Sequence, residues 1–395
     1  MQQHDGPLAR LRRGHEELVL DLLRKHGPLS RGELGARCGL SRTTLYDIVA
    51  ALVANGAVVA SAPQAGPRRR GRPVERLALN PGAGQAIGVD FARRAVHVAA
   101  VNVAHEVVGT ASHAHGPDLS WPQRIELAER LIGSLAGDSL RLDALSAIGV
   151  GVVGPVAWQP ADDMPGPPAE LVPLLRRKFA VPVLVDNNTR LAALAESTWG
   201  TAAGEQDVLY LRLSHGVGGG LVVGGALHRG AYGLSGEFGH ITVDPDGGPC
   251  ECGGTGCLET VASVGAVLEA YRAAGGEAAD IAGLTAAARA GEPVAAGVLA
   301  AAGRRVGAVL AAVSNAVGPG VIVIGGELAA AGEALTGPVE RELSRRLLPV
   351  SRHRLDLRPA ALGEVGAALG GIALVLHQSP LLSRYPGRPR IGEDG

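Results

Sequence analysis

The densest group of chemically reactive residues in this sequence is a cysteine cluster that follows a histidine. Cys250, Cys252 and Cys257 lie within eight residues of one another, and His240 precedes them by ten. Three thiolates and one imidazole make a complete tetrahedral ligand shell for zinc. Because protein ligands fill all four positions, the ion would be structural and would not activate a water molecule. We therefore predict a structural Zn²⁺ site at these four residues.

Carboxylates flank this cluster on both sides. Glu237 lies three residues before His240, and Glu259 lies two residues after Cys257. A metal loop that holds both side chains in place presents polar groups to a hydroxyl-rich ligand. A single glutamate more often caps a helix or forms a salt bridge, so that interpretation stays open beside the binding role.

Two further stretches have the composition of ligand-binding loops. Asp186-Asn187-Asn188 follows an apolar run, and the carboxyl end of a buried strand is a common ligand position in α/β proteins. The same triplet is also typical of a plain turn. The glycine-rich stretch 216–220 suits either a phosphate cradle of backbone N–H groups or a tight hairpin. No lysine follows it to complete a Walker-type loop.

Positive charge is concentrated near the start of the chain. The 395 residues carry a net charge of −1, yet residues 1–80 hold 13 Arg and Lys against 7 Asp and Glu, and the remainder is acidic. A basic head on an acidic body is typical of a protein in which one domain meets a polyanion. The length itself predicts more than one domain.

The basic head has the pattern of a helix-turn-helix. Ser30 and Glu33 have capping-box spacing, which predicts the start of a short helix. Ser41 caps the next helix, whose apolar stripe runs from Leu45 to Leu52 and must face a core. The polar residues beside that stripe then point outward, where they would read bases or position the helix in a DNA major groove: Arg42, Thr43, Thr44 and Tyr46. An ordinary three-helix bundle has the same helix pattern.

A predicted β-hairpin wing strengthens the DNA-binding interpretation. Short strands are expected at 57–60 and 76–79, on either side of a Pro/Gly/Arg segment. Arg70 and Arg72 lie on this segment, and arginines on an extended backbone suit the narrow minor groove of A·T-rich DNA. Taken alone, such a segment is more often a solvated linker. Beside a helix-turn-helix, it favours operator DNA as a partner.

From about residue 84, apolar strands alternate with helices, which predicts one large α/β body of two lobes. Strands are expected at 86–90, 96–103, 106–109, 147–153, 181–185, 208–213, 218–223 and 321–324, and helices at 121–137 and 190–199. No apolar run reaches the roughly 18 residues of a membrane helix, and the polar N-terminus is unlike a signal peptide. We therefore expect a cytoplasmic protein with no membrane partner.

Together these features resemble the ROK family of repressors, open reading frames and sugar kinases. The family's signature Cys-x-Cys-Gly-x-x-Gly-Cys-x-Glu fits from Cys250 to Glu259, and its Glu-x-Gly-His fits at 237–240. The resemblance covers residues 10 to 378, and the head is similar to the winged helix of the repressor branch. It implies a two-lobed, actin-like (ribonuclease-H-like) sugar-kinase fold. It also implies sugar contacts from Asn187, Glu237, His240 and Glu259.

Two departures from the kinase branch bear on activity. Family kinases carry Asp-x-Gly-Gly-Thr-Lys after the first strand, whereas this chain has Asp90-Phe91-Ala92-Arg93-Arg94, where the phosphate-approach glycines are replaced. The position of the catalytic aspartate is Asn188, and an amide cannot act as a general base. We therefore expect no catalytic residues, and a chain that is not an enzyme.

The sequence thus predicts three parts: a winged helix-turn-helix domain at 1–80, a ROK-type sugar-binding domain with the zinc site at 81–379, and a flexible tail at 380–395. The expected function is sugar-responsive repression of carbohydrate-metabolism genes. The expected partners are operator DNA, a sugar or amino sugar effector, and further copies of the chain in a homodimer or homotetramer. Two alternatives remain: an ATP-dependent sugar kinase with a DNA-binding head, and a regulator relieved by a protein partner.

Overall fold

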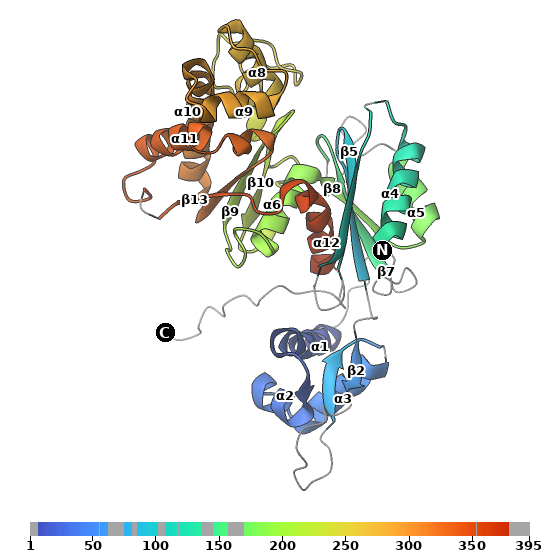
Figure 1. Cartoon of the computed structure of the whole chain (residues 1–395). Helices are drawn as coiled ribbons and strands as arrows, with labels where there is room; N and C mark the ends of the chain where they lie inside the picture. Colours follow the sequence, from blue (N-terminus) through green and yellow to red (C-terminus); the bar gives the residue numbers. More distant parts are fainter. Residues whose placement is uncertain are drawn as a thin grey trace.

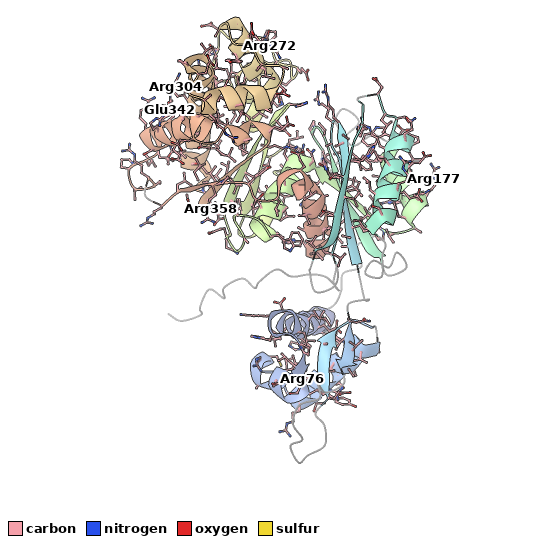
Figure 2. The ribbon with its side chains drawn as sticks, viewed as in Figure 1. Arg76, Arg177, Arg272, Arg304, Glu342 and Arg358 are labelled. Carbon is pink, nitrogen blue, oxygen red and sulfur yellow. The ribbon has the colours of Figure 1, made fainter. Side chains whose placement is uncertain are left out.

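The computed structural model describes residues 7–54, 56–61, 75–80, 85–101, 107–116, 118–135, 145–156, 170–352 and 354–378. An N-terminal unit of helices and a small sheet adjoins a larger body of two lobes, each built on a five-stranded sheet (Figure 1). The outer helices of the body carry charged side chains such as Arg177 and Arg304 (Figure 2). The domain boundaries expected near residues 80 and 379, and the flexible tail, stay predictions, because 81–84 and 379–395 lie outside the described residues.

The N-terminal unit contains the helices and strands that the sequence predicts, with one additional short strand. Its elements are α1 (Pro7–His26), β1 (Leu29–Ser30), α2 (Arg31–Cys38), α3 (Arg42–Ala54), β2 (Val58–Ser61) and β3 (Arg76–Leu79). The capping box is present at the start of α2: the Ser30 Oγ accepts from the Glu33 N–H at 3.2 Å, and the Glu33 carboxylate accepts from the Ser30 N–H at 2.7 Å. Gly39 ends α2 in the left-handed region that favours glycine.

A compact apolar core holds this unit together. The predicted stripe of α3 is buried in it, from Leu45 to Leu52, together with Val19 and Leu20 of α1. The three strands pair antiparallel in the order β1-β3-β2, and Leu77 of the central strand is fully buried against the helices. Because the stripe faces inward, the polar residues at the start of α3 are left on the surface.

The first lobe is a mixed sheet with helices on both faces. Its strands lie in the order β6-β5-β4-β7-β8, antiparallel from β6 to β4 and parallel from β4 to β8. They are β4 (Gln85–Phe91), β5 (Ala95–Val101), β6 (Val107–Ala114), β7 (Leu145–Val152) and β8 (Val183–Asn187). One face carries α4 (Trp121–Leu135) and α5 (Leu171–Phe179), and the other carries α6 (Asn188–Thr198) and α12 (Gly366–Gln378) (Figure 1).

Close packing of α12 on the sheet explains a glycine in the first strand of this lobe. A Cβ placed on Gly88 of β4 would lie 1.7 Å from the carbonyl oxygen of Ala368 in α12. No side chain fits in that space, so the helix backbone rests directly on the strand. The C-terminal helix is thereby fixed to the sheet of the first lobe, although α11, the helix before it, belongs to the second.

The second lobe has a mixed sheet in the order β11-β10-β9-β12-β13. The strands are β9 (Val208–Leu213), β10 (Val217–Val223), β11 (Ala226–His228), β12 (Val321–Gly325) and β13 (Asp356–Pro359). Its helices are α7 (Glu259–Ala262), α8 (Val264–Ala273), α9 (Ile281–Arg289), α10 (Pro293–Val317) and α11 (Glu333–Arg346), with short 3-10 turns η2 (Phe238–His240), η3 (Glu327–Ala331) and η4 (Gly363–Val365). The α/β architecture expected from the sequence is confirmed in both lobes.

One helix of the described residues, α10, is long and apolar enough to cross a membrane by length and composition alone. Half of its most apolar 18-residue segment is buried inside the protein. Leu299, Val306 and Leu310 lie in the core of the second lobe, where α10 packs along α11. These contacts are those of a core helix.

Candidate functional site

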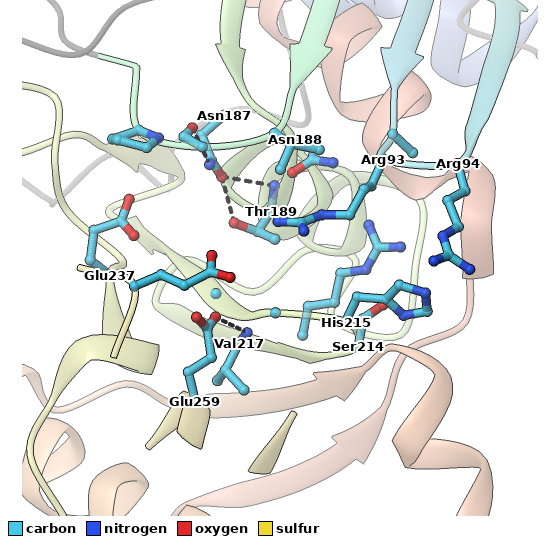
Figure 3. Close-up of a pocket in the computed structure, with 18 of the residues that line it drawn as sticks. Arg93, Arg94, Asn187, Asn188, Thr189, Ser214, His215, Val217, Glu237 and Glu259 are labelled. Atoms are coloured by element: carbon cyan, nitrogen blue, oxygen red, sulfur yellow. Dashed lines mark hydrogen bonds between the residues drawn. The ribbon is translucent and has the colours of Figure 1, made fainter. Parts of the chain in front are cut away.

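A cavity of about 930 Å³ opens between the two lobes and collects most of the residues that the sequence singles out. Its walls come from the carboxyl ends of β4, β7 and β8 in the first lobe and from β10, η2 and α7 in the second. All four predicted sugar-binding residues line it: Asn187, Glu237, His240 and Glu259. Figure 3 shows Glu237 and Glu259 on one wall and Asn187 on the opposite one.

The four predicted metal ligands come together at one edge of this cavity. One ligand atom from each of His240, Cys250, Cys252 and Cys257 lies within 4.8 Å of all the others. The Cys250 sulfur is 3.6 Å from Nδ1 of His240, and the sulfurs of Cys252 and Cys257 are 3.7 Å apart. Zinc bonds of about 2.3 Å to sulfur and 2.1 Å to nitrogen place tetrahedral ligands about 3.8 Å apart for two sulfurs and 3.6 Å for sulfur and nitrogen. The observed spacings therefore fit a zinc ion.

Backbone contacts hold the cysteine loop in this shape. Cys250 N–H donates to the Gly254 carbonyl at 2.9 Å, and Gly256 N–H donates to the Gly248 carbonyl at 2.8 Å. Gly256 has φ +62°, and a Cβ there would lie 1.5 Å from the carbonyl oxygen of Asp244, so only glycine fits. These backbone contacts close the loop without any contribution from a metal ion.

The pKa values of the thiols indicate how a bound cation would stabilise the cysteine cluster. Burial, and then the neighbouring thiols of Cys252 and Cys250, raise the pKa of Cys257 to about 12. The Gly254 N–H, which points at the Cys252 sulfur at 3.4 Å, lowers the pKa of that thiol. Three thiolates so close together repel one another, and a divalent cation removes that repulsion.

Glu237 and Glu259 differ in how they are held. The Glu259 carboxylate accepts a hydrogen bond from the Val217 N–H at 2.7 Å, which ties the start of α7 to β10 (Figure 3). Glu237 lies just before η2, where burial raises the pKa of its carboxyl; His240 and Arg190 lower it, and Glu259 raises it. Two carboxylates on one wall can accept from adjacent hydroxyls of a polyol.

Asn187 is a helix cap as well as a cavity residue. Its side-chain oxygen accepts from the Thr189 and Arg190 N–H groups at 2.9 and 3.1 Å, and its amide nitrogen donates to the Gly154 carbonyl at 2.8 Å. Strand β8 therefore passes directly into α6 with Asn187 as the N-cap, and the plain turn considered as an alternative is not found there. One N–H of the amide is left for a ligand.

An ion-pair network that was not predicted from the sequence lies beneath this wall. Asp186 is buried and pairs with Arg190 at 2.7 Å and with Arg229 at 2.6 Å. Arg190 also donates to the Val156 carbonyl at 2.8 Å and to that of Gly233. The i, i+4 spacing of Asp186 and Arg190 was the available signal. The network fixes the wall because every charge in it is hydrogen-bonded.

The residues that would decide between catalysis and binding lie at the end of the cavity formed by the β4–β5 turn and the start of α6, which we call the inner end. Asn188, which the resemblance to family kinases places where they carry an aspartate, lines the cavity and is buried. Asp90 ends β4 behind it; burial raises the pKa of its carboxyl to about 7, partly offset by Arg212 and Asn188. In the glycine-rich stretch, residues 217–220 belong to β10, which pairs with β9. The hairpin alternative is therefore the correct one.

The predicted DNA-contacting residues that the structure describes lie at the start of α3. Arg42, Thr43 and Tyr46 are exposed, and Thr44 is half-buried with its hydroxyl 2.8 Å from that of Ser41. The guanidinium of Arg31 lies 5.3 Å from the centre of the Tyr46 ring, which links α2 to α3. The other two predicted contacts, Arg70 and Arg72, lie outside the described residues.

Comparison with known proteins places the chain in a family. The model of the ROK family matches residues 86–378. A glucokinase of Halalkalibacterium halodurans is 37% identical over 221 residues, which are 52% of this chain and 66% of the enzyme. A xylose repressor of Bacillus spizizenii is 26% identical over 377 residues, which are 92% of this chain and 94% of the repressor.

A solved structure extends the same similarity to three dimensions. The crystal structure of a ROK family transcriptional regulator, described as a homologue of the Escherichia coli Mlc protein, superposes with a TM-score of 0.77 at 27% identity. The superposition covers 92% of this chain and 96% of the regulator. The resemblance expected from the cysteine signature is confirmed, and this chain belongs to the ROK family.

Proposed function

We propose that this protein is a sugar-responsive transcriptional repressor of carbohydrate-metabolism genes. The observation that carries the proposal is the extent of the similarity. The match to a xylose repressor spans 92% of the chain, whereas the match to a glucokinase spans 52%. A chain that matches a repressor along nearly its whole length carries the parts that a repressor needs in addition to a sugar-kinase-like body.

The N-terminal unit supplies the DNA-binding part of this proposal. We assign it as a winged helix-turn-helix in which α3 is the recognition helix and β2 and β3 flank the wing. Arg42, Thr43, Thr44 and Tyr46 then face the major groove of an operator, and Arg70 and Arg72 enter the adjacent minor groove. As a homodimer or homotetramer, the protein presents two such heads to a palindromic site.

The cavity supplies the sensor. Asn187, Glu237, His240 and Glu259 hold the hydroxyls of a sugar or amino sugar, and Zn²⁺ at the His240–cysteine cluster keeps the loop of Glu237 and Glu259 in place. The support is that all four side chains line one cavity and that the ligand spacings fit the ion. When bound, zinc supplies structural rigidity and no reacting group, because four protein ligands complete its shell.

A packed route joins the sensor to the head. Glu364 of η4 lines the cavity, and α12 begins two residues later. Leu79 ends β3 and packs both against the core of the N-terminal unit and against the cluster that holds Leu369 and Ile372 of α12. A change in lobe closure on sugar binding would therefore reach the head through α12 and Leu79, provided that the sugar binds the two states unequally.

The alternative, a sugar kinase with a DNA-binding head, makes a different prediction. Asn188 cannot take a proton from a sugar hydroxyl. The zinc-loaded chain should therefore release no ADP with ATP and a panel of hexoses and amino sugars. Asn188→Asp alone should also stay inactive, because Phe91 and Ala92 remain at the phosphate end. Turnover on the order of 1–100 per second in the unmodified chain would establish the kinase instead.

A further inference from the structure

The inner end of the cavity carries positive charge that the proposed sugar contacts do not use. Arg93 and Arg94 lie in the turn between β4 and β5, are exposed, and line the cavity. Figure 3 shows Arg93 extending toward Thr189 and Arg94 toward His215. Among the described residues, neither guanidinium has a hydrogen bond or an ion pair.

The carboxylates at the same end already have partners. Glu327 accepts from the Ser214 hydroxyl at 3.2 Å and lies 3.6 Å from Nδ1 of His215. Glu364 lies 3.4 Å from Arg212 and 3.9 Å from His97. None of these contacts involves Arg93 or Arg94, so neither guanidinium is paired with a carboxylate of the described cavity wall.

The buried carboxyl behind this end offsets their charge only in part. Asp90 is fully buried at the end of β4, and burial raises the pKa of its carboxyl to about 7. A large share of that group is therefore neutral at physiological pH. The two ends of the cavity therefore differ in charge: Glu237, Glu251 and Glu259 line its metal end. At its inner end, Arg93 and Arg94, which have no ion pair among the described residues, lie with Arg212 beside Glu327 and Glu364.

A neutral sugar uses only the first of these two ends. Carboxylates and an imidazole suit hydroxyl groups, whereas guanidinium groups suit a phosphate, to which arginine forms paired charge-assisted hydrogen bonds. A phosphate monoester carries about two negative charges near neutral pH, which matches two arginines. A volume of about 930 Å³ is also at the upper end of the range for small-molecule pockets, so it has room for a substituent beyond one sugar ring.

We infer that the effector of this protein is a phosphorylated sugar, whose hydroxyls bind at Glu237, Glu259 and His240 and whose phosphate binds between Arg93 and Arg94. The inference rests on the proposed sensor function and specifies its ligand class. Arg93 and Arg94 are then the residues that decide specificity for an ester over its parent sugar.

Isothermal titration of the full-length, zinc-loaded chain tests the inference. Hexoses and amino sugars are titrated in pairs, each with its 6-phosphate, and ADP is titrated alone. We expect at least one ester to bind about tenfold to a hundredfold more tightly than its parent sugar, as charge-assisted hydrogen bonds predict. Inorganic phosphate should compete with that ester. ADP binding without any binding of a sugar ester would assign the arginines to a nucleotide and overturn the inference.

Variants show whether the arginines cause the preference. In the Arg93→Ala/Arg94→Ala double variant, the ratio of the two affinities should fall toward one. Arg177→Ala, an arginine on the outer surface of α5 in the same lobe (Figure 2), should leave the ratio unchanged. Zinc content and melting temperature report whether each variant is folded. An unchanged ratio in the double variant would overturn the inference.

The outcomes separate this inference from the proposed function. If neutral sugars bind and change operator affinity while their phosphates gain nothing, the inference fails and the sugar-responsive repressor stands. If neither sugars nor their phosphates bind, both fail together.

Discussion

Nδ1 of His240 lies 3.6 Å from the sulfur of Cys250, while the same histidine lines the cavity between the lobes. An imidazole has two nitrogens, so a ring that gives Nδ1 to a metal keeps Nε2 for another partner. His240 thereby joins the proposed metal centre to the proposed sugar site in a single side chain. Loss of the metal should therefore weaken sugar binding.

Replacing a metal ligand tests this link. In Cys252→Ser, bound zinc should fall from one ion per chain toward none, and effector affinity should fall by at least about tenfold, because His240 and the loop of Glu259 lose their anchor. Metal analysis and titration calorimetry measure the two effects. Cys38→Ser, at the cysteine on α2 far from the cluster, serves as the control and should keep both. Full effector binding by a zinc-free variant would disprove the link.

The recognition helix makes a prediction about DNA. Arg42→Ala should weaken binding to the operator by about tenfold or more, because a base or phosphate contact is lost at the exposed start of α3. Fluorescence anisotropy with a labelled promoter fragment measures the change. Arg304→Ala, on the outer surface of α10, should bind as the unmodified protein does. Equal affinities for the two variants would mean that α3 does not face DNA.

Among the described residues, Leu79 packs against both the N-terminal core and the first-lobe cluster that contains α12. Leu79→Ala should bind both effector and operator, yet the effector should change operator affinity less than it does in the unmodified protein, because packing against the cluster that contains α12 is weakened. Leu40→Ala is the matched control, since among the described residues Leu40 packs against the N-terminal core and not against the cluster of α12. Anisotropy titrations with and without effector give the coupling of each variant. Undiminished coupling in Leu79→Ala would exclude this route.

The buried carboxyl of Asp90 predicts a pH dependence of stability. Because burial raises its pKa to about 7, the folded state holds a proton that the unfolded state releases above about pH 4. As the pH rises from about 4 to about 7, this carboxyl therefore lowers the free energy of unfolding. Below that range it is protonated in both the folded and the unfolded state and has no such effect.

Asp90→Asn removes the ionisation and tests the sign. The variant should exceed the unmodified protein in free energy of unfolding by more than about 1 kcal/mol at pH 8, and the difference should shrink toward pH 4. Denaturant unfolding across this range measures it. Asp118→Asn, at an exposed carboxylate of the same lobe, should show no such trend. A variant that is less stable at pH 8 would contradict the account.

Much of the fold was predictable from local pattern. The capping box at Ser30 and the stripe from Leu45 to Leu52 set α2 and α3, and the apolar runs set the strands of both lobes. Strands β1, β11 and β13 were not predicted, because each has only two to four residues. In addition, β1 and β13 form only by pairing with strands far away in the sequence. Such pairing carries no periodic signal in the sequence.

The candidate site was likewise only partly predictable from the sequence. The metal ligands were predictable because three of the four are close in sequence and their types suit one ion. The Asp186–Arg190–Arg229 network was not predictable, and neither was the placement in the cavity of Arg93 and Arg94, which have no ion pair among the described residues. Their importance depends on which charges meet across the two lobes, and that is known only once the chain has folded.

The measurement that bears most directly on the central claim is the operator affinity of the full-length, zinc-loaded protein with and without effector. Fluorescence anisotropy on DNA from its own promoter region, over a panel of sugars and sugar phosphates, provides it. The account predicts specific binding, and a change in affinity of about fivefold or more with at least one ligand of the panel. Operator affinity that stays the same while a sugar or its phosphate is bound would contradict it.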